Sequence, residues 1–348
     1  MASRDGATAP DPRGLRTGLV LGAGGVLGTA WMAGALAALQ RRLPYPVGTV
    51  DLIVGTSAGS ALAAALRCGV PVEDVVELQR GTAMALLPGL SEIDRDAGGP
   101  LPPLPRMRVG SPRLLLSMAL APHRVHPWVV ASALVPQGRA RHTSLEGLVR
   151  GLLAQAETRP RPATARAAAA GWAPGGETWV MAVDYDSGRR VAFGRAGAPP
   201  ATLPEAVVAS CSIPGWYRPT VIGGRRYVDG WVHSTTSLDL LAEVDLDEVY
   251  VLAPMASYVV DTPSSPYARL ERRLRRLITI GLQREARKVH ARGIRVTVLT
   301  PGPEDLTVIG ANLMEPRRRI RVLDTSLRTS AAALATLENA QEANTCSS

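Results

Sequence analysis

The sequence is poor in cysteine, aromatic residues and lysine, and each scarcity narrows the possible classes of protein. Its three cysteines, Cys68, Cys211 and Cys346, are odd in number and lack the paired spacing of a metal site. They indicate a reducing compartment and argue against a disulfide framework. Aromatic residues make up only 4% of the chain, with a single Phe, so the core has to be built from Ala, Leu and Val.

Long apolar runs are missing as well. No stretch approaches the roughly 18 uninterrupted apolar residues of a membrane-spanning helix, and residues 1–14 lack the apolar segment of a signal peptide. We therefore expect a cytoplasmic protein that is at most peripheral to the inner face of a membrane.

The charge is one-sided, because 39 basic residues, all but Lys288 arginine, face 30 acidic ones and leave a net charge of +9. A basic surface favours anionic partners. No nucleic-acid-binding motif accompanies the charge, so nucleic acid is not expected and contact with an anionic membrane is the preferred interpretation. A basic soluble protein without such a partner fits the composition equally well. The oligomeric state is left open.

Strands and helices alternate along most of the chain. Residues 17–21 form an apolar run, a glycine cluster follows at 22–28, and residues 29–42 have helical spacing. The pattern repeats with a strand at 50–54, a turn at 55–59 and a helix after it. Later strands are expected near 178–184, 190–193, 226–228, 248–252 and 294–299, with helices near 203–210, 266–292 and 324–340. Such alternation predicts an α/β fold with a mainly parallel central sheet covered on both faces.

Composition divides the chain into segments. Residues 1–15 are polar and are expected to be a disordered tail. Residues 16–325 form the predicted catalytic domain, within which 85–175 are rich in Pro and Arg and lack strand character. We interpret 85–175 as a helical cap inserted over a site, with an Arg/Ala-rich, mobile part near 157–176. Residues 326–348 are expected to form a C-terminal helix and tail.

The turn Gly55-x-Ser57-x-Gly59 lies between a buried strand and a helix. In that context a G-x-S-x-G sequence indicates a nucleophile elbow, in which a sharp turn exposes the serine hydroxyl and the flanking glycines, Gly55 and Gly59, let strand and helix pass closely. The N-terminus of the following helix would favour negative charge on the oxygen. The alternative is a helix N-cap serine with two packing glycines.

The glycine cluster from Gly22 to Gly28 joins the first strand to the first helix, where free backbone N–H groups can bind an anion. A dinucleotide is disfavoured, since the third glycine comes one residue late and no acidic residue ends the second strand. A P-loop is excluded by the absence of Gly-Lys-Ser/Thr. What remains is an oxyanion hole donated by the backbone around Gly24, Gly25 and Val26.

A serine nucleophile needs a base, and the five histidines are poor candidates. Three of them (His123, His126 and His142) lie in the predicted cap, His290 lies on a basic helix, and His233 is closest in sequence to a motif. Asp229 is the better candidate, because it ends a short strand and Gly230 allows a tight approach to a facing loop. Taken alone, an Asp-Gly pair is more often a simple turn.

Together these motifs resemble the patatin-like phospholipases. The order is a Gly-rich loop, a G-x-S-x-G elbow, then Ala209-Ser210-Cys211-Ser212-Ile213-Pro214-Gly215 and finally Asp229-Gly230. The resemblance covers roughly residues 15–325. It implies a three-layer α/β/α fold and lipid-ester hydrolysis by a Ser57–Asp229 dyad. It also implies backbone donors at Gly24, Gly25 and Val26, supporting roles for Gly28 and Gly230, and no metal or organic cofactor.

Two positions depart from that pattern, since the loop has Ala23 where a glycine is usual and Leu27 where a cation is usual. The missing cation puts phosphate-containing substrates in doubt more than ester cleavage itself. The same departure is compatible with an alternative function, in which the chain is a catalytically weak or inactive relative that acts as a membrane-associated or regulatory protein.

The predicted helix near 266–292 combines leucines at 270, 274 and 277 with arginines at 272, 273, 275 and 276. A basic amphipathic helix can lie on an anionic membrane. The plainer interpretation, which we prefer from sequence, is a helix that covers the sheet and turns an arginine face to solvent.

Overall fold

A computed structural model describes residues 14–82, 103, 109–120, 126–158, 171–259 and 265–345. The predicted tail at 1–15 and the predicted mobile stretch near 157–176 lie largely outside these ranges, as does His123. The division of the chain into tail, domain, cap and C-terminal segment stays a prediction.

One mixed sheet runs through the molecule in the order β5-β6-β3-β2-β1-β7-β8, with β4 paired to β3. Its strands are β1 (Thr17–Leu21), β2 (Leu52–Thr56), β3 (Glu177–Asp184), β4 (Arg190–Phe193), β5 (Thr220–Ile222), β6 (Arg225–Asp229), β7 (Glu248–Leu252) and β8 (Arg295–Leu299). The pairs among β1, β2, β3, β7 and β8 are parallel, whereas the pairs β3–β4, β3–β6 and β5–β6 are antiparallel. The predicted mainly parallel sheet is confirmed.

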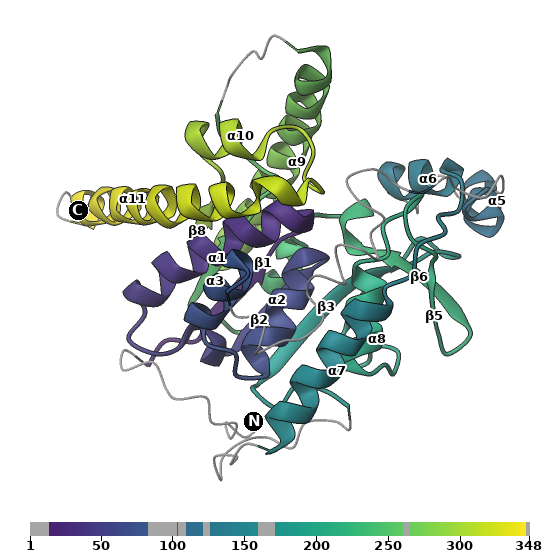
Figure 1. The fold of residues 1–348 in the computed structure, drawn as a ribbon, viewed down its shortest axis with the longest axis horizontal. Coiled ribbons are helices and arrows are strands. Elements are labelled where there is room, and N and C mark those ends of the chain that lie inside the picture. The colour runs from purple at the N-terminus through teal and green to yellow at the C-terminus, as the bar shows by residue number, and fades with distance from the viewer. Residues whose placement is uncertain are drawn as a thin grey trace.

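Helices cover both faces of the sheet (Figure 1). They are α1 (Gly25–Arg42), α2 (Ala58–Arg67), α3 (Val72–Arg80), α5 (Pro112–Leu120), α6 (Pro127–Leu134), α7 (Thr143–Thr158), α8 (Leu203–Ser210), α9 (Pro266–His290), α10 (Pro303–Ile309) and α11 (Arg319–Thr345). Short 3₁₀ turns add η1 (Val47–Thr49), η3 (Gly230–Val232), η4 (Leu238–Glu243) and η5 (Pro316–Arg318).

The alternation of side chains along β1 shows why two helical layers form. Leu19 and Leu21 point into a core shared with α1, whereas Val20 points into a second core that contains Leu282 and Val289 of α9. Successive residues of a strand face opposite sides, so a continuously apolar strand has to be covered twice. The expected α/β/α layering is therefore present.

Several element bounds differ from the sequence predictions. The first helix begins at Gly25, inside the glycine cluster, and the second strand is shifted two residues, to Leu52–Thr56. The C-terminal helix starts at Arg319, before the expected 324, and α10 was not foreseen. The start of the first helix is predicted too late because glycine has a low helix propensity. Gly25 and Gly28 nevertheless lie in the first turn of α1, where they are packed against Met314 and Pro254 and a larger residue would not fit.

The described parts of the predicted cap are helical, and they contribute to different surfaces. Helices α5 and α6 pack over a small core with Val183 and Val228 beside the end of β6. Helix α7 packs against α8 and α2 through Leu145, Val149 and Leu152. Within the described residues, no helix is both long enough and apolar enough to span a membrane.

A buried arginine joins α2 to the start of β3. The Arg67 guanidinium is 2% exposed and donates to the carbonyls of Gly48 and Gly175 at 2.8 Å, to that of Glu177 at 2.8 Å and to Thr178 Oγ1 at 3.2 Å. Burial lowers the pKa of Arg67 to about 9, against the opposing effect of Asp51 and Glu177. The buried charge is tolerated because each of these hydrogen bonds replaces one that the guanidinium would make to water in the unfolded chain.

We expect Arg67→Met to lower the free energy of unfolding by about 3 kcal/mol or more, since three carbonyls and the Thr178 hydroxyl lose the buried guanidinium that donates to them. Urea denaturation measures the change. Arg80→Met is the matched control, because Arg80 is surface-exposed and its ion pair with Asp324 should contribute at most about 1 kcal/mol. Equal effects of the two substitutions would contradict the structural role of Arg67.

Candidate active site

Ser57 occupies a strained turn at the carboxyl end of β2. Its backbone has φ 53° and ψ −122°, in a region that residues other than glycine rarely adopt. A Cβ on Gly59 would lie 2.0 Å from the Leu21 carbonyl oxygen, and one on Gly55 would lie 2.6 Å from the Gly59 carbonyl oxygen. Helix α2 therefore approaches the end of β1 at Gly59, and β2 meets the first turn of α2 at Gly55, at distances that only glycine permits, as an elbow requires.

The strained turn is held by two serines. The Ser57 N–H donates to Ser210 Oγ at 2.8 Å, and Ser210 Oγ in turn donates to the Met181 carbonyl of β3 at 2.6 Å. Ser60 Oγ donates to the Ser57 carbonyl at 2.6 Å. The role of Ser210 was not predicted, although its motif was recognised, because a bond across 153 residues has no signature in local sequence.

The glycine loop lies beside the elbow, since β1 and β2 are neighbouring parallel strands. Gly25 adopts φ +58°, and a Cβ on Gly24 would lie 2.6 Å from Pro254. Leu27 N–H donates to the Leu313 carbonyl at 2.9 Å, while no acceptor among the described residues takes the N–H groups of Gly25 and Val26. These two amides start α1, so they and the helix dipole favour a negative charge placed before them.

Asp229 ends β6 and reaches the same edge through β3. Ala182 of β3 pairs with Asp229, and the preceding residue, Met181, pairs with Thr56. A Cβ on Gly230 would lie 2.6 Å from the Met181 carbonyl oxygen, which shows how closely this turn approaches β3. The register thus brings together the two loops that carry Ser57 and Asp229, 172 positions apart in the sequence.

The Asp229 carboxyl is fully buried. Its Oδ1 accepts from the Trp231 N–H at 3.0 Å, and Oδ2 has no hydrogen-bond partner among the described residues. Burial raises the pKa of Asp229 to about 7, against the opposing effects of the Ser57 hydroxyl and the Trp231 N–H. The hydroxyl thus lies close enough to act on the carboxyl, yet Oδ2 accepts no formed hydrogen bond. A carboxyl of this kind can accept a proton near neutral pH.

The histidines are placed differently from one another. His233 and His126 lie with ring centroids 5.0 Å apart, and burial lowers the pKa of His233 to about 4, so it is neutral at pH 7. His142, which lies in the predicted cap, borders the cavity described next, where its ring stacks on Tyr217 at 3.6 Å and Nε2 donates to the Cys211 carbonyl at 2.8 Å.

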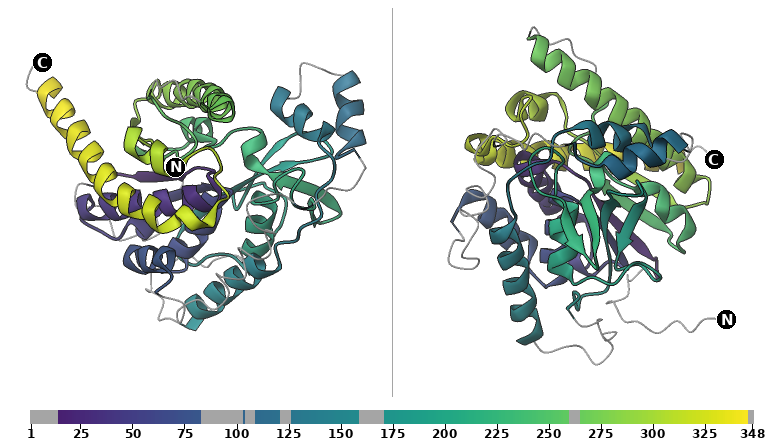
Figure 2. Two further views of the ribbon diagram at one scale, coloured as in Figure 1. Left: turned by 45° about the horizontal axis from the view of Figure 1, so that its top comes forward. Right: turned by 90° about the vertical axis from the view of Figure 1, so that its right-hand side faces the viewer.

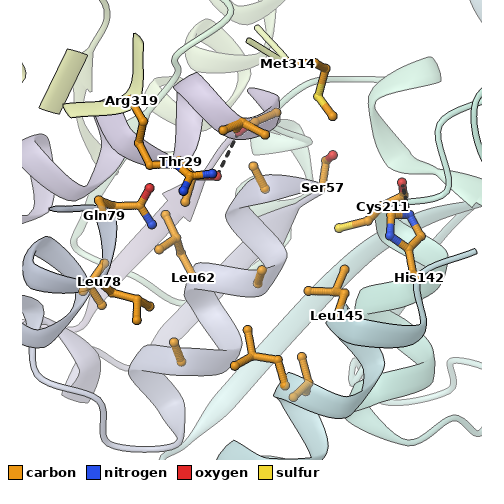
Figure 3. Close-up of a pocket in the computed structure, with 18 of the residues that line it drawn as sticks. Thr29, Ser57, Leu62, Leu78, Gln79, His142, Leu145, Cys211, Met314 and Arg319 are labelled. Atoms are coloured by element: carbon orange, nitrogen blue, oxygen red, sulfur yellow. Dashed lines mark hydrogen bonds between the residues drawn. The ribbon is translucent and has the colours of Figure 1, made fainter. Parts of the chain in front are cut away.

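A cavity of about 160 Å³ opens from Ser57 (Figure 3). Its wall is largely apolar and is built from the start of α1, from α2, α3 and α7, and from loops that follow α8 and α10. The lining residues include Gly25, Val26, Thr29, Ser57, Ala61, Leu62, Leu78, Gln79, His142, Leu145, Leu148, Leu152, Cys211, Ile213, Tyr217, Met314 and Arg319. Of the predicted site residues, Ser57, Gly25 and Val26 face this cavity, and Asp229 lies buried beside it. Its residues from α7 and from 314–319 were not predicted, because they come from segments without a motif.

The candidate site does not offer a set of metal ligands. In the described ranges, no three His, Cys, Asp or Glu side chains gather in an arrangement suited to a metal ion. The arrangement at the edge is instead a hydroxyl, a buried carboxyl and unpaired amides facing an apolar cavity, which suits acyl transfer.

Comparisons with known proteins found one family model and several solved structures. A family model described as patatin-like phospholipase matches residues 19–242. The chain resembles VipD from Legionella pneumophila, with 14% identity, 93% of this chain and 71% of that chain covered, and a TM-score of 0.37. It also resembles the type III effector ExoU of Pseudomonas aeruginosa, with 17% identity, 97% and 64% covered, and a TM-score of 0.33.

A further similar structure is human GIVD cytosolic phospholipase A2 in complex with methyl gamma-linolenyl fluorophosphonate. The identity is 14%, the coverage 91% of this chain and 57% of that chain, and the TM-score 0.37. The chain therefore spans less than two thirds of the length of ExoU and of the human enzyme. No curated protein matches the chain.

The raised pKa of Asp229 predicts a pH-dependent stability. With a pKa of about 7 in the folded chain and about 3.9 in the unfolded chain, the folded state holds a proton that the unfolded state has released. This contribution is full below about pH 4 and is lost as the pH rises through about 7. Asp229→Asn cannot ionise, so at pH 8 it should raise the free energy of unfolding by a few kcal/mol.

Urea denaturation at pH 5 and pH 8 measures this effect, and the difference between variant and wild type should shrink at the lower pH. Asp245→Asn is the control, because the Asp245 side chain is 85% exposed and its substitution should change little at either pH. If Asp229→Asn were destabilising by the same amount at both pH values, the carboxyl would not be held neutral by burial.

Proposed function

Because a patatin-like phospholipase model matches residues 19–242, the chain belongs to the patatin-like phospholipase family, and we propose that it is a serine acyl-ester hydrolase acting on lipid esters. The proposal depends above all on one observation: the strained Ser57 turn lines an apolar cavity, and its hydroxyl lies close enough to act on the buried Asp229 carboxyl. Ser57 is the proposed nucleophile and Asp229 the proposed general base.

In the proposed first step, Asp229 accepts the Ser57 hydroxyl proton while Oγ attacks the ester carbonyl carbon. The carbonyl oxygen becomes negatively charged and is stabilised by the N–H groups around Gly24, Gly25 and Val26. The C–O bond to the alcohol then breaks, and the alcohol leaves with the proton held by Asp229. An acyl group remains on Ser57.

In the second step, Asp229 accepts a proton from a water molecule, which attacks the acyl carbon. The same amides stabilise the new oxyanion. The bond to Ser57 breaks, Oγ recovers the proton from Asp229, and the fatty acid is released. A group whose pKa is near the pH of the reaction can both accept and return a proton. Burial brings the pKa of Asp229 to about 7, which suits this role near neutral pH.

An apolar cavity next to the nucleophile favours a long acyl chain as the group transferred. Leu62, Leu145 and Leu152 from α2 and α7 present only hydrocarbon to it. Burying an acyl chain there contributes about 0.8 kcal/mol per methylene, which selects lipid esters over short polar ones.

We expect Ser57→Ala and Asp229→Asn each to lower kcat for an ester substrate by about a thousand-fold or more, since each removes a partner in the same proton transfer. For the wild type, kcat/KM should rise with pH and level off above about 7, because only the carboxylate form of Asp229 accepts the proton. His233→Ala should be mild, because His233 is neutral at the working pH and acts on neither atom.

Covalent labelling by a fluorophosphonate probe tests whether Ser57 is the nucleophile. Wild type should be labelled covalently, Ser57→Ala should not, and the Asp229→Asn variant should be labelled slowly. If His233→Ala lowered kcat as much as Asp229→Asn does, the assignment of Asp229 as the sole base would be wrong. No labelling and no hydrolysis by folded wild type would favour the inactive, membrane-associated relative instead.

We further propose that α9 contacts an anionic membrane from a cytoplasmic location. Since α9 follows parallel strand β7, it begins at the carboxyl edge of the sheet, where Ser57 lies. Its N-terminal half stands clear of the sheet (Figures 1 and 2). The apolar side chains of Tyr267, Leu270 and Leu277 are 62%, 64% and 53% exposed there. A wholly sheet-covering helix, which we preferred from sequence, describes only the C-terminal half.

The arginines of α9 differ in burial and in their partners. Arg275 is buried and donates to Glu271 and to the Pro254 carbonyl, so it is structural, and Arg272 pairs with Glu271. Arg273 and Arg276 are exposed beside the apolar residues. Cationic and apolar groups together on one projecting helix suit an anionic interface.

Reversing both exposed charges, Arg273→Glu with Arg276→Glu, should weaken binding to liposomes that contain anionic lipid by about ten-fold or more. Sedimentation with liposomes of anionic or zwitterionic composition measures the change. The double reversal Arg284→Glu with Arg287→Glu is the control, because it alters charge equally on the C-terminal half of the same helix. Equal losses in both double variants would indicate a general charge effect and contradict docking through the projecting half.

A further inference from the structure

The part of the cavity that runs along α2 has a row of alanines, here called the alanine face. Ala58, Ala61 and Ala65 all line the cavity that opens from Ser57. They are three and four residues apart, so they follow one another along the same side of the helix. Since each carries only a methyl group, this side of α2 leaves space for a chain that lies parallel to the helix axis.

Larger apolar side chains flank the alanine face. Leu78 of α3 lies on one side of α2, and Leu145 and Leu148 of α7 also line the cavity. Figure 3 shows Leu62 of α2 between Leu78 and Leu145, with Ser57 at the start of the same helix. The space that extends from Ser57 along α2 is therefore a channel with small side chains beneath it and leucines beside it.

The length of the channel follows from its last lining residues. These are Ala65 on α2 and Leu152 on α7. Cys68, the next residue on the same side of α2, is 3% exposed and belongs to the core cluster that also contains Ala65 and Leu152. From Ala58 to Ala65 the helix axis rises about 10 Å. An extended hydrocarbon with C–C bonds of about 1.5 Å advances about 1.3 Å per carbon, so about eight carbons fit.

We propose that the alanine face limits the length of the acyl chain, so that the enzyme prefers esters of fatty acids with about eight carbons. This rests on the proposed hydrolase function and sets an upper limit to the acyl chain which that function favours. Ala65 lies at the closed end of the channel and Ala61 lies about halfway along it. A larger side chain at either position therefore sets a different limit.

The first test compares 4-nitrophenyl esters of butanoate, hexanoate, octanoate and dodecanoate, kept monomeric. They share one leaving group, so differences among them report on the acyl chain. For the wild type, kcat/KM should rise by about four-fold for each added methylene up to octanoate. Dodecanoate should react more slowly than octanoate, because its last carbons have no place in the channel. A rise that continued to dodecanoate, or no dependence on length, would overturn the limit.

Substitutions along the alanine face test where the limit lies. Ala65→Leu should move the maximum to hexanoate and Ala61→Leu to butanoate, because leucine fills the channel from its position onwards. The ratio of kcat/KM for octanoate to that for butanoate should fall from about two-hundred-fold to about fifteen-fold and to about one, respectively. Ala61 is only half-buried, so Ala61→Leu still tests the proposal if Ala65→Leu does not fold.

Gly151→Leu is the matched control. Gly151 is exposed on α7 outside the cavity lining, and a Cβ placed there meets no atom within 4 Å. It adds a leucine without entering the channel, so the dependence on chain length should stay as in the wild type. If Gly151→Leu moved the maximum as Ala65→Leu does, or if the two alanine variants slowed all four esters equally, the channel would be wrong while the hydrolase function stood.

Calorimetric binding of the product acids to Ser57→Ala separates the channel from catalysis. Octanoate should bind more tightly than butanoate, and adding Ala61→Leu should remove the difference. Such a difference in binding, found alongside a wild type that hydrolyses no ester, would retain the channel and overturn the hydrolase proposal. Equal binding of both acids to Ser57→Ala would overturn the channel.

Discussion

The site depends on how the middle of β3 joins two loops that are distant in the chain. Met181 pairs with Thr56, directly before Ser57, and its carbonyl accepts the Ser210 hydroxyl that holds the Ser57 amide. The next residue, Ala182, pairs with Asp229. Displacing β3 by one residue would turn these side chains to the other face of the sheet and separate the hydroxyl from the carboxyl.

Burial is the second constraint on the chemistry. The carboxyl of Asp229 is fully buried, and burial raises its pKa to about 7, while one N–H, from Trp231, and the Ser57 hydroxyl oppose the rise. Had several donors surrounded it, the carboxylate would have been stabilised and would be too weak for the proposed role of general base. Oδ2, which has no hydrogen-bond partner in the part of the chain that the structure describes, therefore matters as much as the identity of the residue.

The C-terminal segment is part of the site although it lies beyond the part of the chain that the family model matches. Residues 310–319 cross the glycine loop, and α11 packs along α1. This explains the unusual loop residue Leu27, whose side chain enters the core and whose N–H is taken by Leu313. The same crossing brings Met314 and Arg319 into the cavity wall.

Local sequence was sufficient for the features that depend on short-range chemistry. The predicted bounds of β1 agree with the structure, and the turn around Ser57 has the strained backbone that its flanking glycines indicate. Glycine spacing and strand–helix alternation report steric limits within a few residues, so they can be recognised without coordinates. The order of the motifs was also enough to suggest the family.

Only the tertiary structure decided what surrounds those motifs. The bond from Ser57 to Ser210, the placement of His142 and Arg319 at the cavity and the exposed apolar half of α9 all join segments that are remote in sequence. Sequence placed His142 in the predicted cap without indicating that it borders the cavity, and favoured α9 as a helix that covers the sheet, because neither residue type nor periodicity shows which surface a segment contacts. The amino acids alone thus determined the fold class and the candidate nucleophile and base, whereas the pKa of Asp229 and the shape and charge of the cavity arise from long-range packing.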